Sequence, residues 1–312
     1  MSLRSPGLRV AYYIDAVGRD MLPSSWHRAR ARRLLATLDS NPLDEFEQRR
    51  LDHYIKLDQP FRLMAGETVG TIPRGRSYYY YDLRRSAAAF NPHMRLFCRF
   101  GDITTVAAEP SIVKSRPIDG DNANSVLMKL DALRHFSVLS DPVPFDAKRP
   151  AAVWRGDGKN PLRRALVRAH GRSPRHDIAY VGKPLDGLGE PGQFLSKPDH
   201  MRFRYIISLE GNDVATNLKW IMASNSLCLM PKPKYETWFA EGLLMPGLHY
   251  AEMRPDFADL DEVVDHYERH PEEARAVIAN AQAHVALFQR RQREDILSLL
   301  VLSRYLELAN SA

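Results

Sequence analysis

Apolar and polar residues follow different patterns in the two halves of the chain. Beyond residue 150, short apolar runs of strand length alternate with segments that have the apolar spacing of helices. The predicted strands are 151–154, 178–181, 203–209, 226–230 and 249–253, and the predicted helices are 161–170, 218–223, 259–269, 271–288 and 291–308. This alternation is typical of a mostly parallel sheet covered on both faces.

The first half is less regular. Residues 1 to about 60 are predicted to be helical, with one helix that begins at Ser24 or Ser25 and a second over 42–57. Four successive tyrosines, 78–81, favour a strand that ends at Asp82. These tyrosines either pack in the interior or form an aromatic platform for sugar rings beside a carboxylate. Shorter strands are predicted at 95–100, 111–116 and 125–130.

A proline-rich stretch, 141–150, is the clearest linker signal. Together with the length of 312 residues it indicates two domains. We expect a first domain over 1–145 with a helical N-terminal segment, and a second over 146–290. The last segment, 291–312, is expected to be a helix that packs back on the first domain.

The composition is that of a globular protein with a modest positive charge, +6. This charge favours an anionic substrate, cofactor or surface. Basic residues gather at 27–33, which indicates either a solvated helix face or docking on anionic lipid or an acidic acceptor. Without a secretory signal or an apolar run of spanning length, the expected location is cytoplasmic, with peripheral contact to the inner membrane open. Cys98 and Cys228 are expected to be buried, free thiols.

The stretch 203–220 predicts an anion site. A strand ends at Glu210 and Gly211, polar residues follow, and a helix begins near Leu218. A helix N-terminus at the carboxyl end of a parallel strand favours phosphate, and Lys219 and Arg155 would add positive charge. The alternative is an ordinary strand–helix unit with a capped helix.

Several segments in a fixed order resemble one family. They are Ala152-Val153-Trp154-Arg155-Gly156, Tyr205 to Gly211, Lys219-Trp220, His249-Tyr250, His270 to Ala274 and Asn280-Ala281-Gln282. The set resembles the CAP10-like glycosyltransferases, family 90, which include protein O-glucosyltransferases and bacterial lipopolysaccharide glycosyltransferases of the LpsA type. The resemblance covers about 70–305, and the short form is more similar to the bacterial branch.

This resemblance implies a GT-B fold, with two Rossmann-like domains facing each other across a cleft and the nucleotide-sugar held by the C-terminal one. It also implies inverting, metal-independent transfer from a UDP-sugar, without a further cofactor. Asp119-Gly120-Asp121 has the spacing of a metal-diphosphate motif, but its loop composition favours a turn.

An inverting transfer needs a carboxylate that takes the proton of the acceptor hydroxyl. Aligning residues 74–82 with the family places Asp82 at the position of the catalytic base. Asp102, which also follows a predicted strand, is the second candidate. Either aspartate could instead cap a helix or form a salt bridge.

For the leaving diphosphate, the resemblance assigns the arginine after a strand, here Arg155, next to Gly156. Where the eukaryotic members carry a second arginine, this chain has Asn217, which leaves the second phosphate contact open. Lys219 and the backbone N–H groups of 213–217 are the expected substitutes. Glu210 either binds ribose hydroxyls or caps the helix, and Asn212, Asp213 and Thr216 have the same two interpretations. The full predicted donor set is Arg155, Gly156, Glu210, Asn212, Asp213, Val214, Ala215, Thr216, Asn217 and Lys219.

The sequence therefore predicts a glycosyltransferase that moves a sugar from a UDP-sugar to a glycan hydroxyl, in lipopolysaccharide or capsule assembly. Its partners would be the donor and a glycan or lipid-linked glycan acceptor, with no nucleic acid. The alternative is a binding or scaffolding protein on the same fold that has lost turnover.

Overall fold

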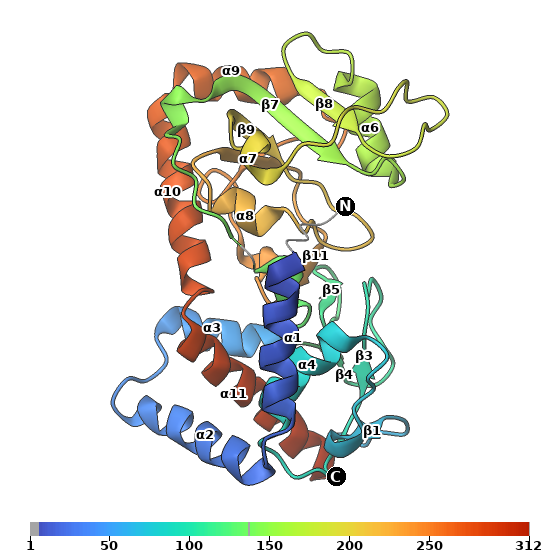
Figure 1. Cartoon of the computed structure of the whole chain (residues 1–312), viewed down its shortest axis with the longest axis vertical. Coiled ribbons are helices and arrows are strands. Elements are labelled where there is room, and N and C mark those ends of the chain that lie inside the picture. Colours follow the sequence, from blue (N-terminus) through green and yellow to red (C-terminus); the bar gives the residue numbers. More distant parts are fainter. Residues whose placement is uncertain (1–5, 137, 312) are drawn as a thin grey trace. The chain divides into compact units, whose positions relative to one another are not determined.

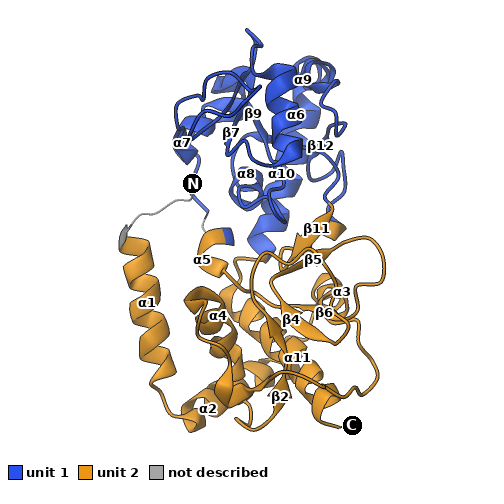
Figure 2. Cartoon of the chain, turned by 90° about the vertical axis from the view of Figure 1, so that its right-hand side faces the viewer, with its two compact units in different colours: residues 1, 135–233, 243–287 blue, residues 2–134, 234–242, 288–312 orange. Residues whose placement is uncertain are grey.

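The computed structural model describes residues 6–136 and 138–311 (Figure 1). Helices and strands alternate along the chain in a mixed α/β fold with parallel sheets. The described residues form two compact units (Figure 2). Unit 1 holds 135–233 and 243–287, and unit 2 holds the residues up to 134, 234–242 and those from 288. The domain boundaries given above stay predictions.

Unit 1 is built on a five-stranded parallel sheet. Its strands are β7 (Arg149–Gly156), β8 (Asp177–Tyr180), β9 (Phe203–Ile207), β10 (Leu227–Met230) and β12 (Ala251–Glu252), in the order β12-β10-β9-β7-β8. Its helices are α6 (Pro161–His170), α7 (Lys197–His200), α8 (Leu218–Met222), α9 (Leu260–Arg269) and α10 (Pro271–Leu287). All four residues of β10 are buried, as expected of a parallel strand covered on both faces.

Unit 2 is mainly helical, with three small sheets. Its helices are α1 (Pro6–Asp20), α2 (Ser24–Ala36), α3 (Glu45–Tyr54), α4 (Ser77–Ala87), α5 (Ala132–His135, whose last residue falls in unit 1) and α11 (Arg291–Asn310). Its strands are β1 (Glu67–Thr68), β2 (Arg95–Leu96), β3 (Cys98–Arg99), β4 (Ser111–Val113), β5 (Ser115–Pro117), β6 (Ser125–Leu127) and β11 (Tyr235–Thr237). Strands β3, β4 and β6 form a parallel sheet, whereas β1–β2 and β5–β11 are antiparallel pairs.

The strand predicted for the tyrosine run is wrong, because residues 77–87 form helix α4. Tyr79, Tyr80 and Leu83 are buried together, which is helical spacing. Tyr80 also donates a hydrogen bond to Asp20 at the end of α1 (2.8 Å). Packing of one helix face against α1 thus overrides the strand preference of tyrosine.

Smaller differences concern the ends of elements. Helix α2 does begin at Ser24, but Pro23 occupies its N-cap position and no side chain caps it. The single strands predicted over 95–100 and 111–116 are each divided between two sheets. Cys98 and Cys228 are both free, and Cys228 is buried whereas Cys98 is half-buried. Among the described residues, no helix is both long and apolar enough to cross a bilayer.

Candidate active site

The sheet of unit 1 places two strand ends at the position where α/β proteins bind ligands. Numbered along the chain, its strands lie in the order 2-1-3-4-5. The direction of the connections reverses between β7 and β9, and ligands bind beyond the carboxyl ends of strands at such a switch point. Arg155 and Gly156 end β7, and the segment 208–211 follows β9.

Arg155 is held firmly at the end of β7. Its Nε donates to the Gln193 carbonyl (2.9 Å), and Nη1 donates to the carbonyls of Trp154 (2.9 Å) and Asp177 (2.8 Å). Its Nη2 pairs with the Asp177 carboxylate at 2.5 Å, and the side chain is only 8% exposed. A phosphate contact of Arg155 stays a prediction, and it would compete with Asp177. At Gly156, a Cβ would come within 2.6 Å of the Trp154 ring, so the position requires glycine.

Residues at the start of helix α6 form hydrogen bonds and an ion pair with the loops that follow β7 and β9. Arg163 donates from Nε to the Glu210 carbonyl (3.1 Å) and pairs through Nη1 with Asp157 (2.6 Å). Asn160, which caps α6, donates to the Gly211 carbonyl (2.6 Å). A Cβ on Gly211 would lie 2.8 Å from Arg163 Nη2. Sequence reasoning missed Asn160 and Arg163, although an Asn-Pro helix start with an arginine in the first turn was the available signal.

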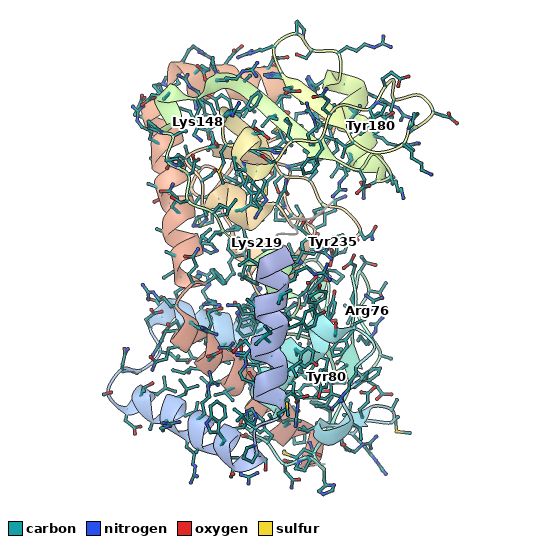
Figure 3. The ribbon with its side chains drawn as sticks, viewed as in Figure 1. Arg76, Tyr80, Lys148, Tyr180, Lys219 and Tyr235 are labelled. Carbon is teal, nitrogen blue, oxygen red and sulfur yellow. The ribbon has the colours of Figure 1, made fainter. Side chains whose placement is uncertain are left out.

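The predicted anion-binding turn leads into a short helix. Asp213, Val214, Ala215 and Lys219 are buried, Asn212 is exposed, and Glu210 and Thr216 are half-buried. Asn217 accepts from Ser208 Oγ (3.1 Å) and donates to the Ile207 carbonyl (3.3 Å), so it fixes the start of α8 to the end of β9. Helix α8 has five residues, one fewer than the helix predicted over 218–223. Figure 3 labels Lys219 on this helix.

The parallel sheet of unit 2 carries a group of charged residues at the carboxyl ends of its strands. Asp102 follows β3, and Lys114 follows β4 directly. Their side chains pair at 2.5 Å, with Lys114 buried and Asp102 28% exposed. After β6, Asp131 pairs with Arg134 (3.2 Å). Asp131 has a backbone φ of 55°, a strained conformation of the kind found at functional sites.

Helix α4 adds an aromatic residue to this group. The Tyr79 ring packs on Phe100 with 5.4 Å between ring centroids. Burial raises the pKa of Tyr79, and the charges of Lys114, Asp131, Asp102 and Arg134 also act on it. We name these five residues, Tyr79, Asp102, Lys114, Asp131 and Arg134, the charge cluster. Arg76, labelled in Figure 3, lies over Gly101, where a Cβ would meet its Nη1 at 2.9 Å.

Asp82 lies inside helix α4, so the prediction that it ends a strand is wrong, whereas its role as catalytic base stays a prediction. Its Oδ1 accepts from the Tyr12 hydroxyl and its Oδ2 from the Ala132 N–H, both at 2.8 Å. Burial raises the pKa of Asp82 to about 6, and the charge of Asp131 acts in the same direction. Through Ala132, Asp82 anchors the turn that carries Asp131.

Other predicted features have structural contacts. Trp238 stacks on Tyr54 (4.0 Å between centroids) and donates to Glu294 (2.6 Å), so its ring belongs to the packed interior of unit 2. Asp121 accepts from the Ala123 N–H in a loop where Gly120 has a φ of 81°, as expected of a turn.

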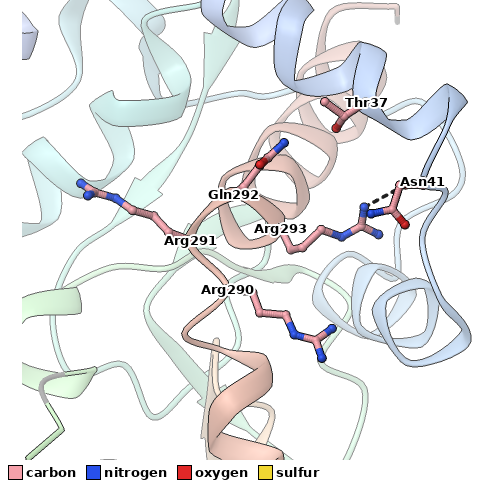
Figure 4. Close-up of a pocket in the computed structure, with 6 residues that line it drawn as sticks. All are labelled: Thr37, Asn41, Arg290, Arg291, Gln292 and Arg293. Atoms are coloured by element: carbon pink, nitrogen blue, oxygen red, sulfur yellow. Dashed lines mark hydrogen bonds between the residues drawn. The ribbon is translucent and has the colours of Figure 1, made fainter.

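A cavity of about 330 Å³ at the start of α11 is lined by Thr37, Asn41, Arg290, Arg291, Gln292 and Arg293. Its arginines diverge, with Arg291 pointing away from Arg293 (Figure 4).

Comparison with known proteins assigns the chain to a family. Residues 129–307 match the model of Glycosyl transferase family 90. The chain is 41% identical to "O-glucosyltransferase LpsA" of Dichelobacter nodosus over 304 residues, which cover 96% of each protein. It is also 24% identical over 162 residues to the "O-glucosyltransferase rumi homolog" of Anopheles gambiae, covering 49% of this chain and 40% of that protein.

Proposed function

Since the chain belongs to Glycosyl transferase family 90, we propose that it is an inverting glycosyltransferase that moves glucose from UDP-glucose to a glycan hydroxyl. The observation that carries the proposal is the 41% identity, over 96% of the chain, to a protein named as an O-glucosyltransferase. The acceptor is a lipopolysaccharide or capsule intermediate, and the transfer takes place in the cytoplasm without a metal. In this proposal the two units are the two domains of a GT-B enzyme, which is supported by the parallel sheet in each of them.

The donor binds at the switch point of unit 1. The chemistry of the strand ends supports this assignment, since Arg155 and Arg163 lie on the two sides of that point and favour a diphosphate. Both guanidinium groups are already oriented by backbone carbonyls, so little side-chain entropy is lost on binding. Glu210 and Asn212 are assigned to the ribose and sugar hydroxyls, and Lys219 to the charge of the leaving group.

Asp102 is the catalytic base in this proposal. The acceptor oxygen attacks the anomeric carbon, the bond from that carbon to the diphosphate oxygen breaks, and its electron pair leaves with UDP. Asp102 takes the proton of the hydroxyl, and the Lys114 ammonium, paired with this carboxylate at 2.5 Å, holds it in position. Asp102 lies beyond a strand end and is 28% exposed, whereas both oxygens of Asp82 accept protein hydrogen bonds. Asp82 is therefore assigned a positioning role, through Ala132 and Asp131.

Two measurements test this function. A thermal-shift screen of UDP-glucose, UDP-galactose, UDP-xylose and UDP-N-acetylglucosamine should show the largest stabilisation with UDP-glucose, because a ligand of the native state raises the apparent stability. UDP release with isolated lipopolysaccharide-core acceptors should then require Asp102. Binding without release in the wild-type protein, with every acceptor, would support a scaffolding protein instead.

A further inference from the structure

One side of helix α1 exposes a continuous apolar stripe. Val10, Ile14, Val17 and Met21 recur at intervals of four, three and four residues, which places them on one side of a helix. Their exposed fractions are 58%, 69%, 41% and 81%, respectively. The Met21 N–H bonds to the Val17 carbonyl (3.1 Å), so the helical path continues to the end of the stripe. An exposed apolar stripe of this kind is typical of a surface that binds a protein or a membrane.

The opposite side of α1 is fixed to helix α4. Tyr12 donates to Asp82 (2.8 Å), Tyr13 bonds to Ser77 Oγ (2.6 Å), and Asp20 accepts from Tyr80 (2.8 Å). The orientation of α1 is therefore set by specific polar bonds, and the apolar stripe faces outward as a consequence. Gly7, Ala11 and Gly18 continue the exposed arc, and at its margin lie Leu8, which is exposed, and Asp15, which pairs with Arg19 (2.6 Å).

Helix α2 supplies positive charge beside this stripe. The two helices meet at a corner (Figures 1 and 2), where Met21, Leu22 and Trp26 are all exposed. On the outer face of α2, Arg28, Arg32 and Arg33 are exposed and form no ion pair within the described ranges. Arg30, in contrast, pairs with Asp295 at 2.5 Å.

We propose that the α1 stripe and the outer face of α2 form a membrane-docking surface for an anionic lipid bilayer. The apolar side chains would enter the boundary between headgroups and acyl chains, and the three arginines would meet lipid phosphates. Trp26, at the corner, is a residue type enriched at that boundary. The charge favours anionic lipid over a second copy of this chain as the occupant, because a twofold contact would pair this surface with an equally basic one, whereas lipid supplies phosphates.

Membrane docking would bring the enzyme to a lipid-linked acceptor, and only this purpose rests on the proposed function. Vesicle binding needs neither donor nor acceptor, so it can fail or succeed independently of glycosyl transfer. Conversely, UDP release with a detached, water-soluble acceptor tests the transfer without any membrane.

The test is co-sedimentation of the full chain with vesicles. Wild type should pellet with phosphatidylcholine vesicles that contain phosphatidylglycerol and remain in solution with phosphatidylcholine alone, and added salt should weaken the binding. Met21→Asp should lower the vesicle affinity at least about tenfold, because it places a charge in the apolar boundary. Met64→Asp is the matched control, since Met64 lies in the same unit at 80% exposure. It should bind like wild type.

The charges are tested separately. Arg28→Ala combined with Arg32→Ala should weaken binding about 25-fold, because each arginine near an anionic surface contributes about fivefold. Arg49→Ala combined with Arg172→Ala removes two exposed arginines elsewhere and should have no effect. Equal binding by Met21→Asp and Met64→Asp, or equal binding to neutral and anionic vesicles, would overturn the proposal. So would a wild-type dimer that ignores vesicles and that Ile14→Asp converts to a monomer.

Discussion

The two parallel sheets of this protein differ in the chemistry at their carboxyl ends. In unit 1, Arg155 and Arg163 are held largely by backbone carbonyls. In unit 2, Asp102 and Asp131 are each paired with a cation, Lys114 and Arg134. The first arrangement supplies oriented positive charge, and the second supplies carboxylates that are held by neighbouring cations.

In the proposed mechanism, this difference separates donor binding from proton transfer. A diphosphate is bound well by guanidinium groups, whose planar sets of N–H donors match phosphate oxygens, and unit 1 supplies two of them. A general base must be within reach of the acceptor hydroxyl, and Asp102 is 28% exposed. Substitutions in the two regions should therefore affect different quantities, namely donor affinity in unit 1 and turnover in unit 2.

The largest expected effect is on turnover in Asp102→Asn. Losing the base should lower the rate of UDP release in the presence of acceptor by about 10²–10⁴-fold. The thermal shift caused by UDP-glucose should be unchanged, because the donor site lies in the other region. Asp121→Asn, in a loop of unit 2, serves as control and should keep the full rate. A wild-type rate in Asp102→Asn would remove this residue from the mechanism.

The next effect concerns donor affinity. Arg155→Ala should weaken UDP-glucose binding about 10- to 100-fold, which is the loss expected for one or two charged hydrogen bonds. Asp177→Asn removes the ion-pair partner but keeps the guanidinium, so it should bind the donor at least as tightly as wild type. If both variants lose stability alike while calorimetry shows unchanged donor affinity, Arg155 is a structural residue only.

A third prediction concerns Asp82 and the pH dependence of stability. Because burial raises the pKa of this residue from 3.8 to about 6, the folded protein binds more protons than the unfolded chain in that window. The free energy of unfolding therefore falls as the pH rises from about 4 to about 6. Relative to Asp82→Asn, the free energy of unfolding of wild type should fall by about 3 kcal/mol between acid and neutral pH. Urea unfolding of both proteins across this range measures the difference, and parallel pH profiles would contradict the assignment.

The smallest expected effect is that of Asn217→Ala. It removes the two hydrogen bonds that join the start of α8 to the end of β9, at a cost of about 1 kcal/mol. Gln289→Ala, at an exposed position, should change the unfolding free energy very little. A larger loss of donor affinity than of stability in Asn217→Ala would instead show that the side chain contacts the donor.

Local sequence patterns predicted unit 1 better than unit 2. The apolar run at β10 and the Asn-Pro start of α6 determine those elements locally, so the predicted strand and helix lie where the structure has them. The strand predicted for the tyrosine run was wrong because the helical spacing of its buried residues becomes decisive only when α1 packs against them. Strand β11 was missed because its partner, β5, lies far away along the chain.

The candidate site was only partly accessible from the sequence. Asp102 was predicted as a strand-end carboxylate, but nothing local shows that Lys114 and Tyr79 lie near it. The contacts of Arg163 with Glu210 and Asp157 likewise depend on how α6 packs beside the sheet. Residue types and strand ends could be predicted, whereas the pairing of charges between distant segments needed the structure.

The most direct test of the central claim is the stereochemistry of the first product. Wild-type enzyme supplied with UDP-α-glucose, with water or a soluble glycan as acceptor, is followed by proton NMR before the anomers of any free glucose equilibrate. A single displacement assisted by Asp102 predicts a first product with the β configuration, which is free β-glucose from water or a β-linkage to the glycan, and no product with Asp102→Asn. A first product with the α configuration, or β product formed at the wild-type rate by Asp102→Asn, would contradict the account.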